Sequence, residues 1–238
     1  MAVLNPTSKT LTEGSLPARL NSLRAGVLGA NDGIVSTAGL VFGVAGATSN
    51  HAALVIAGLA GMVAGALSMA GGEYVSVSSQ RDSELAALAR QRREASADPA
   101  AVRVKLRDYY LNQGLSPDLA DRVAGELSGH RMLDHHALTS LGIDAASPVS
   151  AWAAARASML AFVAGALIPL LAIVFAPETL RLPITLAAVC LALLLTGWTS
   201  ARLGNAAVLP AMARNLVVGS LTMALSYTVG ALVGGQLS

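Results

Sequence analysis

The sequence has little of what soluble proteins use to fold and to bind charged partners. Of its 238 residues only 13% are charged and 4% are aromatic, and Cys190 is the single cysteine. An average soluble domain is about 25% charged. One cysteine excludes an internal disulfide framework, and the near balance of 16 basic against 14 acidic residues excludes a nucleic-acid-binding protein with a strongly basic surface. A hydrophobic content of 54% excludes a disordered chain.

The few charges are clustered, and the segments between them are long and apolar. A segment of about 20 apolar residues is long enough to cross the bilayer core. Five segments reach this length: residues 25–47, 52–72, 157–176, 182–200 and 216–237. A soluble helix of this length would carry a polar stripe, which these segments lack. We therefore predict an all-α membrane protein with five transmembrane helices.

The distribution of basic residues predicts how the chain is oriented. Residues 1–22 lack the apolar core of a cleavable signal peptide, so we expect the first membrane helix to act as the insertion signal. With these residues in the cytosol, every Lys and Arg except Arg181 lies on the cytosolic side, where positive charge is favoured. The C-terminus is then outside, and the composition suggests a bacterial inner membrane. The predicted organisation is a cytosolic tail (1–22), helices one and two (23–76), a cytosolic helical module (77–150) and helices three to five (151–238).

The cytosolic module mixes charges of both signs at helical spacing. Apolar positions between residues 82 and 93 predict that the second membrane helix continues into the module. Asp98 and Ser116 are each followed by proline, a pattern typical of a helix start. We expect the first of these helices to end near Gly114 and the second to run through Leu127 and into the segment after it.

Asp32 is a carboxylate deep within a predicted membrane helix. Such a charge costs about 2.5–3.5 kcal/mol on insertion scales, so the default interpretation is functional. A structural hydrogen bond to another helix is the alternative. At about 1.5 Å per residue, Asp32 lies roughly 10 Å below the inner surface. Helix two runs in the opposite direction, which predicts Met69 at similar depth and Glu73 one turn nearer the cytosol.

Two carboxylates and a thioether form a plausible site for a divalent transition metal. Carboxylates suit manganese and magnesium, whereas sulfur favours softer ions, so the mixed set indicates iron(II), with manganese(II) as the second candidate. Packing is the alternative role for Met69, and a position at the membrane interface is the alternative for Glu73. A proton and a metal ion can compete for Asp32, which would couple their movements.

Small residues recur four positions apart on the predicted membrane helices. Such spacing lets two helices approach closely. The pairs are Gly29 and Gly33, Gly39 and Gly43, Gly61 and Gly65, and Gly230 and Gly234.

Two long motifs resemble the vacuolar iron transporter family, which includes yeast calcium-cross-complementing and plant nodulin-21-like branches. They are RLNSLRAGVLGANDGIVSTAGLVFGVAGA and GALSMAGGEYVSVSSQRD, and the later segments GALIPLL and ARNLVVGSLTMALSYTVGALVG are similar to the same family. The resemblance covers nearly all of residues 20–235. It implies a homodimer with the ion path at its interface and proton-coupled export of iron(II) from the cytosol. It places transport residues at Asp32, Met69 and Glu73.

The resemblance also implies a metal-collecting site in the cytosolic module, and here the chain departs from the family. The family's ligand positions match Gln91, Glu94, Val102, Lys105, His136, Ala137 and Ser140. Only Glu94 remains a carboxylate, so we expect a structural role for the module. Glu94, His130 and His136 are its weak metal candidates, and a solvated histidine pair is the favoured interpretation of His135 and His136.

The sequence favours a transporter over an enzyme. It contains no Ser-His-Asp or Cys-His arrangement, metal-hydrolase motif or phosphate-binding loop. We expect no resident cofactor and no nucleic-acid partner. The expected partners are a divalent metal ion as substrate, protons, membrane lipid and a second copy of the chain. The alternative function is a non-transporting scaffold or metal sensor that retained the fold, and the intact set in helices one and two favours transport.

The predicted orientation can be tested by cysteine accessibility. A cysteine introduced at Asn50 should react with a membrane-impermeant thiol reagent added outside, and one at Ser96 should not, because the two positions lie on opposite sides of the membrane. Labelling of intact cells measures both. The opposite pattern would overturn the orientation.

Overall fold

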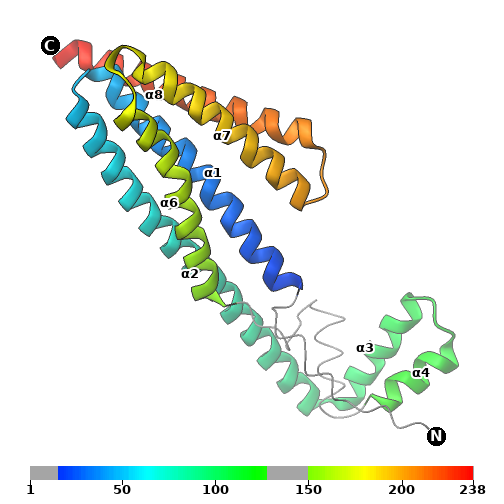
Figure 1. Ribbon diagram of the computed structural model, residues 1–238. Coiled ribbons are helices and arrows are strands. Elements are labelled where there is room, and N and C mark those ends of the chain that lie inside the picture. The colour runs from blue at the N-terminus through cyan, green and yellow to red at the C-terminus, as the bar shows by residue number, and fades with distance from the viewer. Residues whose placement is uncertain (1–15, 128–149, 238) are drawn as a thin grey trace, which may run out of the picture. The chain divides into compact units, whose positions relative to one another are not determined.

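The computed structural model describes residues 16–127 and 150–237, and every element in these ranges is helical (Figure 1). The predicted all-α class is confirmed, and five of the described helices are long and apolar enough to cross a membrane. The elements are α1 (Leu16–Ala47), α2 (His51–Ala97), α3 (Pro99–Asn112), α4 (Pro117–Glu126), α6 (Ala151–Phe175), the 3-10 turn η1 (Glu178–Leu180), α7 (Arg181–Leu203) and α8 (Val208–Leu237).

The helices extend beyond the apolar segments that predict them. The last span, expected from residue 216, belongs to a helix that begins at Val208, so this predicted start is wrong. Arg214 lies within that helix, where its Nε donates a hydrogen bond to the Pro210 carbonyl at 3.3 Å. Similarly, α6 begins at Ala151, where the Ser150 hydroxyl accepts a hydrogen bond from the Ala153 amide at 3.3 Å. Hydropathy marks the apolar part of a helix, whereas capping groups and basic side chains support turns beyond it.

The chain divides into two compact units. The bundle unit comprises Arg19–Val75 and Ser150–Ser238, and the polar unit comprises Met1–Ala18 and Ser76–Val149. Helix α2 contributes to both units, since it is unbroken from His51 to Ala97. The predicted continuation of the second membrane helix is thereby confirmed.

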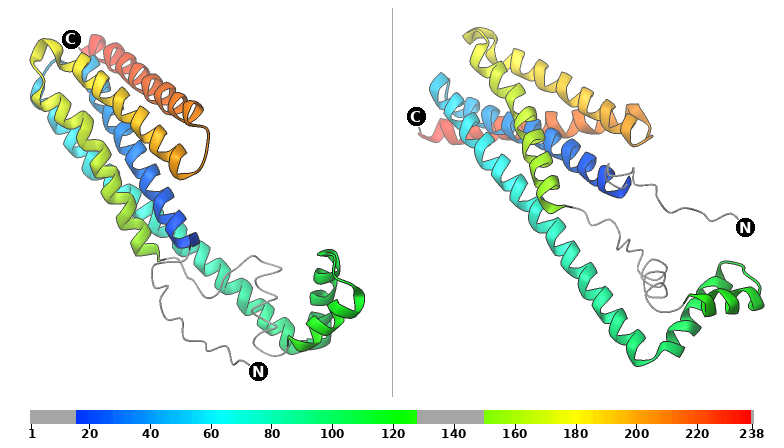
Figure 2. Two further views of the ribbon diagram at one scale, coloured as in Figure 1. Left: turned by 45° about the vertical axis from the view of Figure 1, so that its right-hand side comes forward. Right: turned by 60° about the horizontal axis from the view of Figure 1, so that its bottom comes forward.

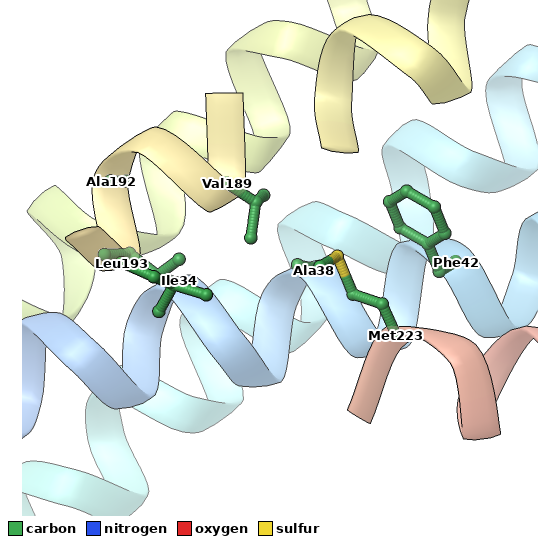
Figure 3. Close-up of a cluster of buried hydrophobic side chains, with 7 residues drawn as sticks. All are labelled: Ile34, Ala38, Phe42, Val189, Ala192, Leu193 and Met223. Atoms are coloured by element: carbon green, nitrogen blue, oxygen red, sulfur yellow. The ribbon is translucent and has the colours of Figure 1, made fainter. Parts of the chain in front are cut away.

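Helix α1 lies at the centre of the bundle unit. One buried cluster joins α1 to α7 and α8 and consists of Ile34, Ala38, Phe42, Val189, Ala192, Leu193 and Met223 (Figure 3). A second joins the same helix to α2 and α6 through Val41, Leu54, Leu170 and Ile173. Helices α2 and α6 therefore pack on one side of α1, and α7 and α8 on the other (Figure 2).

Glycines bring α1 into backbone contact with two neighbouring helices. A Cβ on Gly165 of α6 would collide with the carbonyl oxygen of Ala30, and a Cβ on Gly230 of α8 would collide with the carbonyl oxygen of Gly43. On α1 itself, a Cβ on Gly33 would collide with the carbonyl oxygen of Phe162. Because these contacts involve backbone atoms, no side-chain rotation can relieve them. The predicted close approach of small-residue faces is confirmed at these crossings.

The outer surface of the bundle unit is apolar, as expected for contact with lipid. On α8 the exposed side chains include Val217, Leu221, Leu225, Val229 and Leu232, each more than half exposed. Soluble monomers rarely expose a continuous apolar stripe of this kind. This surface and the helix lengths identify the chain as an integral membrane protein.

Aromatic and basic side chains gather at one end of the bundle unit. Tyr74 of α2 and Trp152 of α6 pack with ring centroids 4.7 Å apart. The Arg202 guanidinium lies 5.6 Å from the Trp198 ring centroid near the end of α7. Trp, Tyr and Arg are enriched where a membrane helix meets the headgroups. These residues therefore mark one boundary of the apolar layer.

The polar unit is built on a capped helical hairpin. The Asp98 carboxylate accepts a hydrogen bond from the Ala101 amide at 2.9 Å, which confirms the predicted start of α3. The chain leaves α3 through Gly114, whose φ of 91° suits glycine. The Arg107 Nε lies 3.0 Å from the Asp121 Oδ1 and links α3 to α4. Helix α4 ends at Glu126, where Leu127 is the C-cap, so the predicted unbroken run through Leu127 is wrong, and the segment after Leu127 falls outside the described residues.

The backbone contact between α6 and α1 can be tested with one methyl group. We expect Gly165→Ala to destabilise the protein by roughly 1–3 kcal/mol, because overpacked interiors lose about that much. Thermal unfolding in detergent measures the change. Gly26→Ala is the matched control, since nothing lies within 4 Å of a Cβ at that position. Equal melting temperatures for the two variants would contradict the packing described.

Candidate functional site

A cavity of about 340 Å³ lies between α1 and α2 in the bundle unit. Asp32, Met69 and Glu73, the three residues predicted to bind metal, all line it. Phe162 of α6 completes the wall. The other lining residues are Ser36, Thr37 and Leu40 of α1 and Gly61, Gly65, Ser68 and Gly72 of α2.

Helical periodicity explains why these residues meet. On α1, Asp32, Ser36 and Leu40 are four residues apart and share one face. On α2, Met69 and Glu73 are also four apart. The two helices are joined by a short connection between Ala47 and His51, so they run antiparallel and positions of equal depth come together. Their binding to metal stays a prediction.

Glycines on α2 give the cavity its shape. A Cβ on Gly61 would collide with the Leu40 side chain, and a Cβ on Gly65 would collide with the Phe162 ring. Neither position can therefore accept a larger residue unless the cavity wall moves. The two glycines allow an aromatic ring and a leucine to close the space beside Asp32.

The Asp32 carboxylate has no protein partner among the side chains that the structure describes, residues 24–127 and 150–236. No hydrogen bond or ion pair involves its oxygens, although the Ser36 hydroxyl donates to the Asp32 backbone carbonyl at 2.6 Å. The side chain is partly buried within an apolar helix bundle. A charge removed from water without a partner is costly. Asp32 is therefore suited to hold a cation or a proton.

Glu73 differs from Asp32 because it has a cationic neighbour. Its side chain is only 10% exposed, and its Oε1 lies 3.7 Å from the Nη2 of Arg24 on α1. Arg24 itself is 68% exposed. One cavity thus contains one paired and one unpaired carboxylate.

Hydroxyl groups in the cavity were missed by the sequence analysis. Thr37 is 1% exposed, and its hydroxyl has no hydrogen-bond partner in the described part of the chain. Ser36 and Ser68 add two further oxygens. Ser36 is four residues from Asp32, so helical spacing could have identified it, whereas Ser68 is next to Met69, and adjacent residues on a helix point about 100° apart.

The described residues of one chain supply a small donor set. They include no group of three or more His, Cys, Asp or Glu side chains that could hold a metal ion. The cavity instead offers two carboxylates, a thioether and hydroxyl oxygens. This mixture suits a borderline divalent ion that is held briefly rather than a permanent structural metal.

Comparison with known proteins decides the family. The VIT family model matches residues 23–231, which is most of the chain. The chain belongs to the VIT family. Vacuolar iron transporter homolog 3 of Arabidopsis thaliana is 38% identical over 219 residues, covering 92% of this chain and 86% of the relative. The vacuolar iron transporter of Acanthamoeba castellanii is 39% identical over 209 residues, covering 87% of this chain and 77% of the relative.

In this VIT-family protein, the metal candidates of the polar unit have different neighbours from the residues that line the cavity. Glu94 pairs with two cations, since its Oε1 lies 3.3 Å from the Arg90 Nε and its Oε2 lies 3.7 Å from the Lys105 Nζ. Val102 is 3% exposed and packs in the interior of the unit. The candidates His130 and His136 lie outside the described residues.

The pairing of Glu94 predicts that this carboxylate contributes little to metal binding. We expect Glu94→Gln to leave the iron(II) affinity of the purified protein unchanged within about twofold, because the positive charges of Arg90 and Lys105 beside Glu94 repel a divalent cation. Anaerobic calorimetry on the full chain measures the affinity. A loss of about tenfold or more would show that Glu94 is a ligand after all.

Proposed function

We propose that this VIT-family protein exports iron(II) from the cytosol across its membrane in exchange for protons, with manganese(II) as a second substrate. It acts as a transporter and not as an enzyme. The observation that carries the proposal is that Asp32, Met69 and Glu73 all line the same cavity. The printed names of the relatives, vacuolar iron transporters and their homologues, support iron as the substrate.

The donor set accounts for the choice of ion. Carboxylate oxygens replace part of the water shell of a hard or borderline cation, and the Met69 sulfur adds a soft ligand that magnesium and calcium do not favour. The hydroxyls of Ser36, Thr37 and Ser68 supply neutral oxygens, which bind without adding charge. A site of this kind favours transition-metal ions over magnesium and calcium, and it does not hold the ion so tightly that the ion cannot leave.

Proton coupling follows from the state of Asp32. Its carboxylate has no partner among the described side chains, so either a proton or a metal ion must neutralise it within the apolar layer. The two cannot occupy the same oxygens together. Metal that reaches Asp32 from one side therefore releases a proton, and a proton arriving from the other side releases the metal.

A second copy of the chain would strengthen the site. One protomer contributes two carboxylates and a thioether, with only neutral hydroxyl oxygens beside them, and a second protomer would double the anionic and sulfur ligands within reach of the ion. Pairing two protomers through the α1 and α2 faces would bring two such sets together. The exposed apolar residues Ile56, Val63 and Leu67 of α2 are suited to such an interface or to lipid.

The basic residues orient the transporter. Arg24, Arg156, Arg202 and Arg214 flank the helices at the end of the bundle unit where Tyr74 and Trp152 pack. This end faces the cytosol in our proposal, which places metal entry near Glu73. A scaffold or sensor is the second candidate function, favoured by the neutralised Glu94 in the polar unit.

Transport by reconstituted protein tests the role of the cavity. We expect Asp32→Asn to abolish iron(II) uptake into proteoliposomes, because an amide neither carries the compensating charge nor exchanges a proton. Met69→Leu should retain uptake and shift the preference from iron(II) toward manganese(II), since the soft ligand is lost while the volume is kept. A metal-sensitive dye inside the vesicles, under an imposed proton gradient, measures both.

The Glu94→Gln variant serves as the control, because it removes a carboxylate outside the cavity. Native uptake by Asp32→Asn would overturn the proposed mechanism. Binding of iron(II) by the wild type without any uptake would favour the sensor.

A further inference from the structure

The ion pair between Arg24 and Glu73 is asymmetric. The carboxylate lines the cavity and is 10% exposed, whereas the guanidinium is 68% exposed and reaches it from the neighbouring helix. The closest approach is 3.7 Å, longer than the 2.7–2.9 Å or so of a strong charge-assisted hydrogen bond. The contact therefore gives Glu73 a countercharge through a long ion pair and not through a short hydrogen bond.

The two ends of this pair respond differently when it breaks. The guanidinium stays solvated when it loses Glu73, because most of its surface is already exposed to the surrounding water or headgroup layer. The carboxylate cannot follow, since α2 holds it in the cavity wall, and a buried charge without a partner is strongly unfavourable. Release of Arg24 thus requires another cation to reach Glu73.

We propose that Arg24 is a displaceable internal cation that occupies Glu73 in the metal-free protein and leaves when a divalent ion binds that carboxylate. This inference rests on the proposed function, because it needs metal to reach Glu73. Arg24 competes with the substrate and sets its affinity at this end of the cavity. It is a positioning residue, since it acts through Glu73 and does not touch the ion.

Competition explains why an arginine can lie beside a cation site. A fixed positive charge next to the cavity would repel a divalent ion, whereas a mobile one neutralises the empty site and is then replaced. The metal-free cavity is thereby kept from holding two unpaired carboxylates, Asp32 and Glu73, at once. Without the guanidinium, the empty protein would be less stable and its affinity for metal higher.

Substitution of Arg24 tests the competition by two measurements on the full-length protein. We expect Arg24→Gln to lower the iron(II) concentration for half-maximal uptake about threefold to tenfold. In detergent without metal, the same variant should melt at a lower temperature than the wild type. Anaerobic addition of iron(II) should raise the melting temperature of the variant by more than it raises that of the wild type. Arg24→Lys should behave like the wild type in both measurements, because it keeps the countercharge.

A double-mutant cycle separates pairing from general electrostatics. In a Glu73→Gln background, Arg24→Gln should change neither the metal-free melting temperature nor the metal-induced shift, since the partner is gone. Arg202→Gln is the matched control for charge loss, as Arg202 lies over Trp198 and has no contact with Glu73. It should leave the metal-induced shift unchanged.

The outcomes are distinct. Arg24→Gln could change the melting temperature and the metal-induced shift equally with and without Glu73, and this result would overturn the inference. The inference would also be overturned if Arg202→Gln changed the metal-induced shift as much as Arg24→Gln does, because the effect would then be that of a nonspecific surface charge. An unchanged or higher half-saturating concentration in Arg24→Gln, with normal wild-type uptake, would also overturn it and leave the proposed function intact. Absence of both uptake and a metal-induced shift in the wild type would instead overturn the proposed function.

Discussion

Backbone contact between α1 and its neighbours is the constraint on which the bundle depends. Gly165 places α6 against the Ala30 carbonyl, and Gly230 places α8 against the Gly43 carbonyl. Lipid offers no hydrophobic drive for helices to associate, so close packing of small residues replaces it. With α6 on one side of α1 and α7 and α8 on the other, the face that carries Asp32 is left toward α2, and the polar cavity forms there.

The cavity contains two carboxylates in unlike surroundings. Asp32 lies deeper and is unpaired among the described side chains, whereas Glu73 lies one turn nearer the basic end and has Arg24 beside it. An ion moving along this path would meet a carboxylate that already has a cation and then one that has none. In the proposed transport, this difference would make the two carboxylates bind the ion with unequal strength without any change in the fold.

Much of this arrangement could be predicted from the sequence, for physical reasons. Apolar runs predict spans because the bilayer demands length, and Asp98 predicts a helix start because its carboxylate caps a free amide. Counting residues along antiparallel helices brings Met69 to the depth of Asp32. The contact of Arg24 with Glu73 could not be predicted this way, since it depends on how the helices are rotated about their axes. The start of α8 at Val208 could not be predicted from hydropathy, because hydropathy does not register a turn in which the arginine side chain bonds to a carbonyl of its own helix.

The burial of Val102 leaves one of the family-matched ligand positions poorly suited to a metal ligand. The family resemblance matches this position to a metal ligand, yet here the side chain is 3% exposed and packs inside the polar unit. A carboxylate introduced there would be buried in the interior of the polar unit, at a cost of several kcal/mol before any metal could bind. Lys105, paired with Glu94, would have to change as well. A metal-collecting site at these positions would therefore require several substitutions together, because a carboxylate at position 102 alone is unfavourable.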